Sequence, residues 1–505
     1  MWVMLGKILL IAAIATMGTG FGAEVSALWG QSGEKWTPQS RLPDFSYAGY
    51  HSGEQPLPTV PPGVSVKAFG AKGDGIVDDS QAFIDAIAST KFGAIEVPPG
   101  RYKITRILEI NRGGIVLRGA GPDKSILFCP VPLNDIKPNW GATTNGLTTS
   151  EYSWSGGMIG ITGDYQGKTL TPVIAEAVRG DTVLSVESAS GLKVGQRVQI
   201  FESDLPDDSL ARHLYSDDPG DTGKLLGKTK ASLVCKITRI DGNRVHFDRP
   251  LRCDIRLLWR PQIRNFTPTV TEVGIENLCF EFPNTPYMGH FKEVGFNAIA
   301  LSKCSDCWVR NIKIVNADSG IFPSGIFCTI QGVVFESNRT PDPKGKSTGH
   351  HGLSFGGSDN FLTDFDFRTQ FIHDISVDAG ASGNVSANGK GEDLCFDHHK
   401  RCCYENLFTN IDAGIGSHLW RCGGGDALGK NCAARGTFWN IRAQRPQKEP
   451  AAAFGPLSMN FVALQTTQPS ETKSDGKWFE AISPEAIFPQ DIHKAQLARR
   501  LMEVK

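Results

Sequence analysis

Val64-Ser-Val-Lys-Ala-Phe-Gly-Ala-Lys-Gly-Asp-Gly75 opens the stretch that decides the fold, and it is followed by Asp78-Asp79-Ser-Gln-Ala-Phe-Ile-Asp-Ala-Ile-Ala88 and Gly93-Ala-Ile-Glu-Val-Pro-Pro-Gly-Arg-Tyr102. The first part predicts a strand and a glycine turn. The second predicts a short helix that begins at an aspartate and places its apolar residues on one face. The third predicts two strands joined by a Pro-Pro-Gly turn.

Short β-rich runs continue outward from this stretch and recur at intervals of about 20 to 30 residues. They are Trp308–Ile314, Thr329–Phe335, Asn360–Phe367, Asn406–Ile411 and Thr437–Ile441. Several contain asparagine, which can form ladders between stacked coils. The 56 glycines, 29 prolines and only 7 methionines suit many short strands joined by turns. We therefore expect a mostly β protein built from repeated coils.

The run from Phe69 through Asp78-Asp79 to Tyr102 resembles the N-terminal signature of the pectate-lyase-like superfamily, which includes rhamnogalacturonase- and epimerase-like proteins. This resemblance implies an all-β fold, a right-handed parallel β-helix closed at its N-terminal end by a short helix, which residues 79–88 would supply. The signature specifies the fold much more than the reaction.

Six segments are expected along the chain. Residues 1–27 have the pattern of a signal peptide, with Lys7, an apolar run and small residues up to Ala27, and cleavage after Gly22 or after Ala27 fits the small-residue rule. The apolar part is too short to span a membrane, which predicts a secreted or periplasmic protein. The other segments are an extended arm (28–63), the first coils (64–162), an inserted small antiparallel β domain (163–268), the remaining coils (269–449) and a tail ending in a helix (450–505).

Charge and cysteine usage limit the partners and the cofactors. The formal net charge of -1 gives no support for nucleic acid as a partner. Twelve cysteines would allow disulfides in an oxidising compartment, for example Cys422 with Cys432 or Cys304 with Cys328. The acidic loop 204–221 could bind Ca²⁺, although it lacks the spacing of a calcium-binding helix-loop-helix. The sequence requires no other cofactor and leaves the oligomeric state open.

Ionisable pairs recur at a nearly constant interval in the second half of the chain. His350-His351, His373-Asp374, Asp397-His398 and Trp420-Arg421 are separated by 23, 24 and 23 residues. If each interval is one coil, these residues stack on one face, with one member of each pair directed outward. The interval predicts a candidate active-site column.

Chemistry on an acidic polysaccharide fits this column best. Uronate polymers can lie along an outer groove, where cations neutralise the carboxylate and a base removes the adjacent C5 proton, as β-elimination and epimerisation require. We expect Asp397, His398, His399, His373 and Lys400 to be catalytic, with His398 or His399 as the base. We expect Arg401, Arg421, His350, His351, Asp374, Trp420 and Arg435 to bind the substrate. Asp397-His398-His399 is also similar to the Asp-Pro-His element of β-helical mannuronan epimerases.

Other functions stay open. A glycoside hydrolase could use the carboxylates of Asp374 and Asp397, or Asp397 with Glu392 or Asp393. His350, His351, His373 and Asp397 could hold a divalent metal, although no motif specifies one. A non-catalytic carbohydrate-binding or surface protein could keep the same scaffold.

Overall fold

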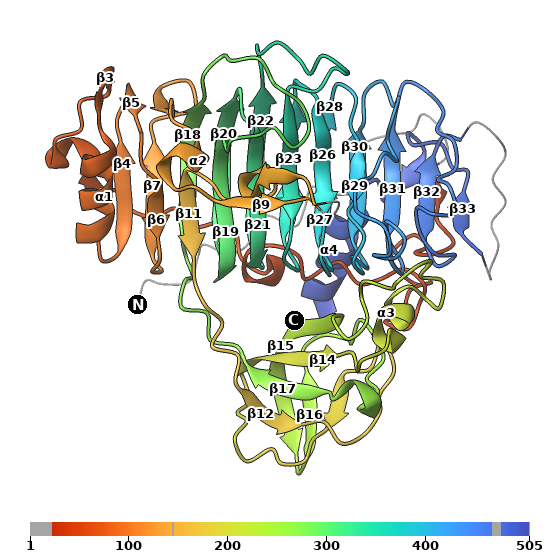
Figure 1. The fold of residues 1–505 in the computed structure, drawn as a ribbon. Coiled ribbons are helices and arrows are strands. Elements are labelled where there is room, and N and C mark those ends of the chain that lie inside the picture. Colours follow the sequence, from red (N-terminus) through yellow and green to blue (C-terminus); the bar gives the residue numbers. More distant parts are fainter. Residues whose placement is uncertain (1–22, 144–145, 467–475, 504–505) are drawn as a thin grey trace.

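The computed structural model describes residues 23–143, 146–466 and 476–503. Its body is a parallel β-helix in which successive coils add strands to long parallel sheets (Figure 1). One sheet has seven strands in the order β29-β26-β23-β21-β19-β11-β6. These strands are β6 (Leu108–Ile110), β11 (Ile159–Thr162), β19 (Asn297–Ser305), β21 (Ser319–Ile326), β23 (Gly349–Phe355), β26 (Phe371–Val377) and β29 (Phe396–His398). The expected β-helix architecture is confirmed.

The remaining parallel ladders run along the other sides of the coil. Their first strands are β2 (Val64–Ser65), β3 (Asp74–Asp78), β4 (Gly93–Val97), β5 (Gly100–Lys103), β7 (Ile115–Gly119), β8 (Ser125–Phe128), β18 (Gly274–Glu281), β20 (Trp308–Val315) and β22 (Thr329–Glu336). The later ones are β24 (Phe361–Thr363), β25 (Asp366–Phe367), β27 (Val385–Ala387), β28 (Lys390–Gly391), β30 (Leu407–Asp412), β31 (Thr437–Arg442), β32 (Asn460–Leu464) and β33 (Trp478–Glu480).

The N-terminal end of the coil is closed by helix α1 (Ser80–Ser89), beside β4 in Figure 1. Asp79 is the N-cap residue, and the carboxylate of Asp78 before it accepts the N–H of Ser80, the first helical residue, at 3.0 Å. Phe83 is fully buried and meets the ring of Tyr102 edge-on, with 5.5 Å between ring centroids. The apolar face of α1 therefore covers interior side chains that the first coil would otherwise expose to water.

Side-chain ladders hold the later coils in register. Asn360 donates to Asn384 and Asn384 donates to Asn406, both over 3.0 Å, and all three are buried. Phe408, Phe438 and Phe461 stack nearly parallel in the interior at 5.4 and 5.3 Å. The ladders satisfy buried polar groups while the phenylalanines fill the core, which fixes the position of each coil on the next.

The predicted antiparallel insert lies between β11 and β18 and projects from the β-helix (Figure 1). Its six-stranded sheet has a separate hydrophobic core. The helix α3 (Ser209–Leu214) instead packs against residues of the β-helix, including Tyr404 and Ala433. The strands are β12 (Thr169–Pro172), β13 (Val183–Ser185), β14 (Arg197–Ser203), β15 (Lys230–Asp241), β16 (Arg244–Phe247) and β17 (Gln262–Asn265).

Buried ion pairs fix the insert to the β-helix. Arg249 and Arg252 of the insert both bind the carboxylate of Asp359, and all three side chains are at most 5% exposed. Arg179 of the insert binds Glu405 at 2.8 Å. Charges buried to this degree are stable only when paired, so the two carboxylates hold the insert at one position.

The arm and the tail lie together on the C-terminal coils. Trp29 and Phe45 of the arm share a core with Trp439 and with Ile492, the first residue of α4 (Ile492–Glu503). The strand β1 (Glu24–Val25) pairs in parallel with β34 (Ile487–Phe488). Residues 1–22 of the predicted signal lie outside the described residues. Cleavage after Gly22 would keep β1, whereas cleavage after Ala27 would remove it.

Two shorter strands and one short helix complete the coil region. They are α2 (Leu133–Ile136), β9 (Trp140–Ala142) and β10 (Thr148–Ser150). Each of the twelve cysteines, all within the described ranges, carries a free thiol. Among the helices described, none is long and apolar enough to cross a bilayer.

Candidate functional site: a histidine cluster on three neighbouring coils

The candidate site lies on β23, β26 and the end of β29. The register places His351 opposite His373, and Ser376 opposite Asp397. The predicted column of residues 350, 373, 397 and 421 is therefore displaced within the sheet. Arg421 follows β29 in a loop, and its guanidinium donates to the carbonyl of Ile372 on β26. Side chains from different strands still meet: Asp397 contacts His373 and His399, and the ring of His373 stacks on that of His351.

Asp397 is the anionic centre of this site. Its fully buried carboxylate accepts the Gly423 N–H at 2.7 Å, the Ser376 hydroxyl at 2.9 Å and the His399 Nδ1–H at 2.9 Å. Burial raises the pKa of Asp397, but the neighbouring His373 and His399 and the hydrogen bonds from His399 and Gly423 lower it overall. Asp397 is therefore a carboxylate at every ordinary pH.

His399 lies beside Asp397 and is held in its protonated form. Burial lowers the pKa of His399, but the charge of Asp397 and the hydrogen bond to it outweigh burial and raise that pKa to about 9. The side chain of His399 is 27% exposed, which leaves its other ring nitrogen open to the surface. At neutral pH the molecule therefore presents an imidazolium at the edge of this coil.

Three further histidines are buried and neutral. The rings of His350 and His351 stack at 4.0 Å, and the ring of His351 stacks on that of His373 at 5.1 Å. Burial lowers the pKa of all three, to about 4 for His373. The expected alternation of faces is wrong for His350 and His351, whose rings lie together. Because Ser376 donates to Asp397, its oxygen is left to accept the Nδ1–H of His351 at 3.2 Å.

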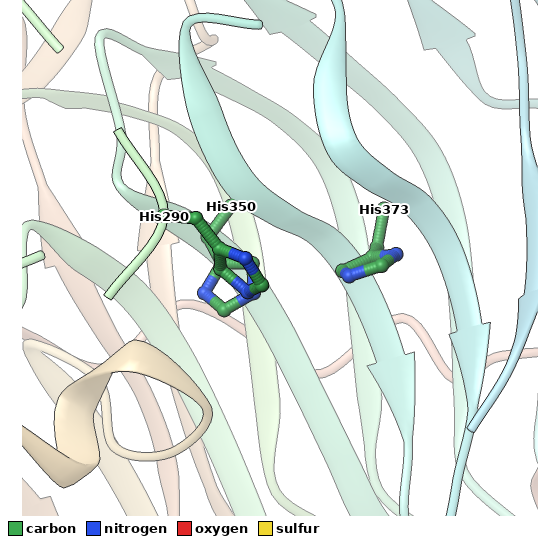
Figure 2. A group of neighbouring side chains, drawn as sticks. All are labelled: His290, His350 and His373. Atoms are coloured by element: carbon green, nitrogen blue, oxygen red, sulfur yellow. The ribbon is translucent and has the colours of Figure 1, made fainter. Parts of the chain in front are cut away.

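His290 completes the cluster from a different part of the chain. It lies in the loop between β18 and β19, is exposed, and meets the ring of His350 edge-on at 4.5 Å. Figure 2 shows it beside His350, with His373 on the neighbouring strand. Burial and the nearby charges of His399 and Arg421 lower the pKa of His290 to about 4. Sequence analysis missed His290, because no repeat or motif marks this loop.

A buried carboxyl lies behind His350. Glu293 is 3.4 Å from the Nδ1 of His350, and it accepts the Tyr287 hydroxyl at 2.5 Å and the Ser153 hydroxyl at 3.0 Å. Burial raises the pKa of Glu293 to about 7. His350 and His373 thus share one arrangement, an imidazole with a carboxyl group behind its Nδ1.

Residues 63–129 match the family model described as "Rhamnogalacturonase A/epimerase, pectate lyase-like". The resemblance to pectate-lyase-like proteins is confirmed. Among curated relatives, the pre-neck appendage protein of Bacillus phage B103 is 35% identical over 99 residues, which are 19% of this chain and 11% of that protein. This chain thus spans a small part of the length of that relative.

Solved structures resemble this chain over a larger share of its length. The tailspike protein gp49 of Pseudomonas phage LKA1 is 15% identical, with a TM-score of 0.46 over 75% of this chain and 63% of its own. The Gp54 tailspike of Acinetobacter baumannii bacteriophage AP22, solved with a capsular saccharide, is 9% identical, with a TM-score of 0.44 over 79% and 57%. These similarities assign no activity to this chain.

The β-helix places His398 inside rather than at the site. Its side chain is fully buried and its ring lies 5.4 to 5.6 Å from those of Phe408, Phe438 and Phe454. β29 ends at His398, so the chain turns and directs His399 to the opposite side. The two candidates for the base are thus separated, and only His399 reaches the surface.

Asp374 is also enclosed. It accepts the N–H groups of Phe371 and Cys395, both at 2.9 Å, and burial raises its pKa to about 7. Asp393, which is mostly buried, accepts from the hydroxyl and the N–H of Ser417. Neither carboxyl lies open at the surface beside Asp397, as a pair of hydrolytic carboxylates would.

Of the predicted binding residues, Arg401 and Arg421 are exposed. Lys400, which we expected to be catalytic, donates to the carbonyl of Gly425 at 2.9 Å. Trp420 is half-buried and contacts the rings of Phe438 and Phe454. Arg435 does not join the cluster, because it binds the buried Glu405 at 2.6 Å.

Two other features lie away from the cluster. A hollow of about 500 Å³ is lined by residues of β5, β8, β18 and β20 and contains none of these histidines. In the acidic loop, Asp204 accepts the N–H groups of Leu210 and Ala211 in α3, and Asp218 binds Lys430 at 2.5 Å. These carboxylates already have protein partners, and Ca²⁺ binding by the loop stays a prediction.

Proposed function

We propose that this protein binds an extracellular, uronate-containing polysaccharide at the histidine cluster. The observation that carries the proposal is the pair of outward cations, the His399 imidazolium held by buried Asp397 and the exposed guanidinium of Arg421. Both charges act on His290 and His373, so they lie on the same part of the surface. A polymer lying along the coils could therefore place its uronate carboxylates against both His399 and Arg421.

The binding test compares two polymers with one backbone, polygalacturonate and its fully methyl-esterified form. The wild-type protein is expected to bind the charged polymer and not the esterified one, more weakly as salt rises. Arg421→Ala should weaken binding about tenfold or more, because charge-assisted hydrogen bonds contribute roughly 1.5–3 kcal/mol. Arg368→Ala, which removes an exposed arginine outside the cluster, is the matched control. Equal loss in both variants would contradict the proposal.

The pH dependence follows from His399. Because its pKa in the fold is about 9, His399 is charged at neutral pH, and binding should weaken as pH rises through about 9. That pKa lies above the ordinary value of 6.5, so the stabilising contribution of the His399–Asp397 pair is complete below that value and is lost as pH passes the folded pKa. Arginine stays charged throughout. Affinity that is constant between about pH 7 and about pH 10 would exclude His399 from binding.

We further propose that the protein cleaves the bound polysaccharide by β-elimination. A protonated His399 suits neutralisation of the carboxylate together with Arg421, rather than the role of base. We assign the base to His290, whose exposed imidazole is neutral at pH 7. It would take the C5 proton, and the electron pair would form the C4–C5 double bond and expel the O4 substituent.

Incubation of the protein with polygalacturonate distinguishes three outcomes. Ultraviolet absorbance from an unsaturated uronate would support elimination, with loss of that signal in His290→Ala. New reducing ends without this absorbance would support a hydrolase instead. Binding without either signal would leave the protein as a carbohydrate-binding β-helix.

A further inference from the structure

We propose that His290, His350 and His373 form a binding site for one divalent transition-metal ion, with Zn²⁺ as the best fit. One potential ligand nitrogen from each ring lies within 4.8 Å of the others. The three come from two neighbouring strands and a distant loop, so only the fold brings them together (Figure 2). The site differs from the one considered from sequence, because His290 takes the place of His351 and Asp397.

The buried ring of His373 lacks the partners that a buried imidazole normally has. It is 3% exposed, and neither ring nitrogen makes a hydrogen bond. Its Nδ1 lies 3.4 Å from the Asp397 carboxylate, and one ring nitrogen points toward His290 and His350. A buried polar atom without a partner is costly, and a metal ion would satisfy it.

The groups behind the rings match those of metal-binding histidines. Such histidines generally direct the second ring nitrogen at a carboxylate or carbonyl, which fixes the tautomer and the ring orientation. His373 has Asp397 in this place and His350 has Glu293, each at 3.4 Å. Two independent carboxyl groups thus lie beside the Nδ1 atoms of the two buried imidazoles, without a hydrogen bond to either.

Access and geometry also favour an ion. Nitrogens that bind Zn²⁺ tetrahedrally at about 2.1 Å lie roughly 3.4 Å apart. This separation is compatible with three nitrogens that lie within 4.8 Å of one another, one of them on the exposed ring of His290. Three imidazoles leave a fourth position for water or an anion. The absence of a carboxylate among the three ligands disfavours Ca²⁺, which prefers oxygen.

The metal site does not depend on the glycan proposal. A bound ion would occupy the nitrogen of His290 that elimination needs as a base. The metal-loaded protein would therefore bind glycan without eliminating it.

The test is titration of the metal-stripped, full-length protein with Co²⁺, followed by its visible absorption, and with Zn²⁺ by calorimetry. We expect one ion per chain, with affinity at least tenfold weaker in His290→Ala, whose exposed position makes misfolding a minor concern. His418→Ala is the matched control, because it removes a histidine from the neighbouring Asp374–Cys395–His418 group. That variant should bind like the wild type.

Three results would overturn the proposal. They are the absence of saturable binding in the wild type, equal binding in His290→Ala, or loss of binding in His418→Ala alone. Displacement of Co²⁺ by an equal concentration of Ca²⁺ would also overturn it, because three imidazoles should select against that ion.

Discussion

Asp359→Asn is expected to lower the free energy of unfolding by about 3–5 kcal/mol. The change removes the carboxylate that binds both Arg249 and Arg252, whose side chains are 3% and 5% exposed. Asparagine keeps the size of the side chain and tolerates the left-handed backbone at this position, where φ is 55°. The loss therefore measures the effect of the charge, because buried Arg249 would lose its ion pair and Arg252 would keep only the more distant Glu405 carboxylate, at 3.9 Å.

Urea unfolding of this variant should be compared with that of Asp123→Asn. The Asp123 carboxylate is 81% exposed and binds Lys313 at 3.2 Å, so its removal should cost less than about 1 kcal/mol. Because Arg249 and Arg252 lie on the insert, the insert should also become more accessible to protease. Unfolding midpoints that coincide for the two variants would show that the buried ion pairs contribute nothing to stability.

Asp397→Asn should reduce glycan binding at pH 7 to 8 by about tenfold or more. Without the Asp397 carboxylate, burial is the largest influence on His399 and outweighs the charge of Asp378, so the pKa of His399 falls below its ordinary value and the imidazolium is lost. The direct measurement is the titration of the His399 ring by NMR, which should move from about 9 to the acid side of neutrality. Arg421 should keep its charge and a residual affinity.

Asp426→Asn is the matched control for this second variant. Asp426 is exposed in the loop that follows Arg421, and its neutralisation changes the net charge by the same amount. Its binding should equal or slightly exceed that of the wild type, because a repulsive charge has been removed. If both variants lost binding equally, a folding defect or net charge would account for the loss, and the role of Asp397 would be refuted.

Much of the fold could be predicted from local sequence. Asp78 and the apolar residues of the next helix determine α1 by short-range capping and periodicity, and the asparagines at 360, 384 and 406 form the expected ladder. The turn at Asp241-Gly242 likewise joins two antiparallel strands of the insert. Each of these features depends on neighbours in the chain or on one repeat of the coil.

The site was only partly predictable, for a physical reason. The recurring interval indicated the coil length, but turns of unequal length place Asp397 opposite Ser376 rather than beside His373 in the sheet. His290 lies in a loop that carries no period. Arg435 was predicted to bind substrate because no acidic partner lies near it in the sequence. In the folded chain it binds Glu405, which also binds Arg179 of the insert.

The position of the insert has a consequence for how the chain folds. β11 pairs with β19, although the whole insert separates them in sequence. The first and last strands of the insert, β12 and β17, pair antiparallel, so a folded insert holds its two ends side by side. Bringing the strands on either side of a folded insert together then costs about as much conformational entropy as closing a short turn, and less than closing a long flexible loop. Early folding of the insert would thus act as a clamp that lets the next coil add quickly.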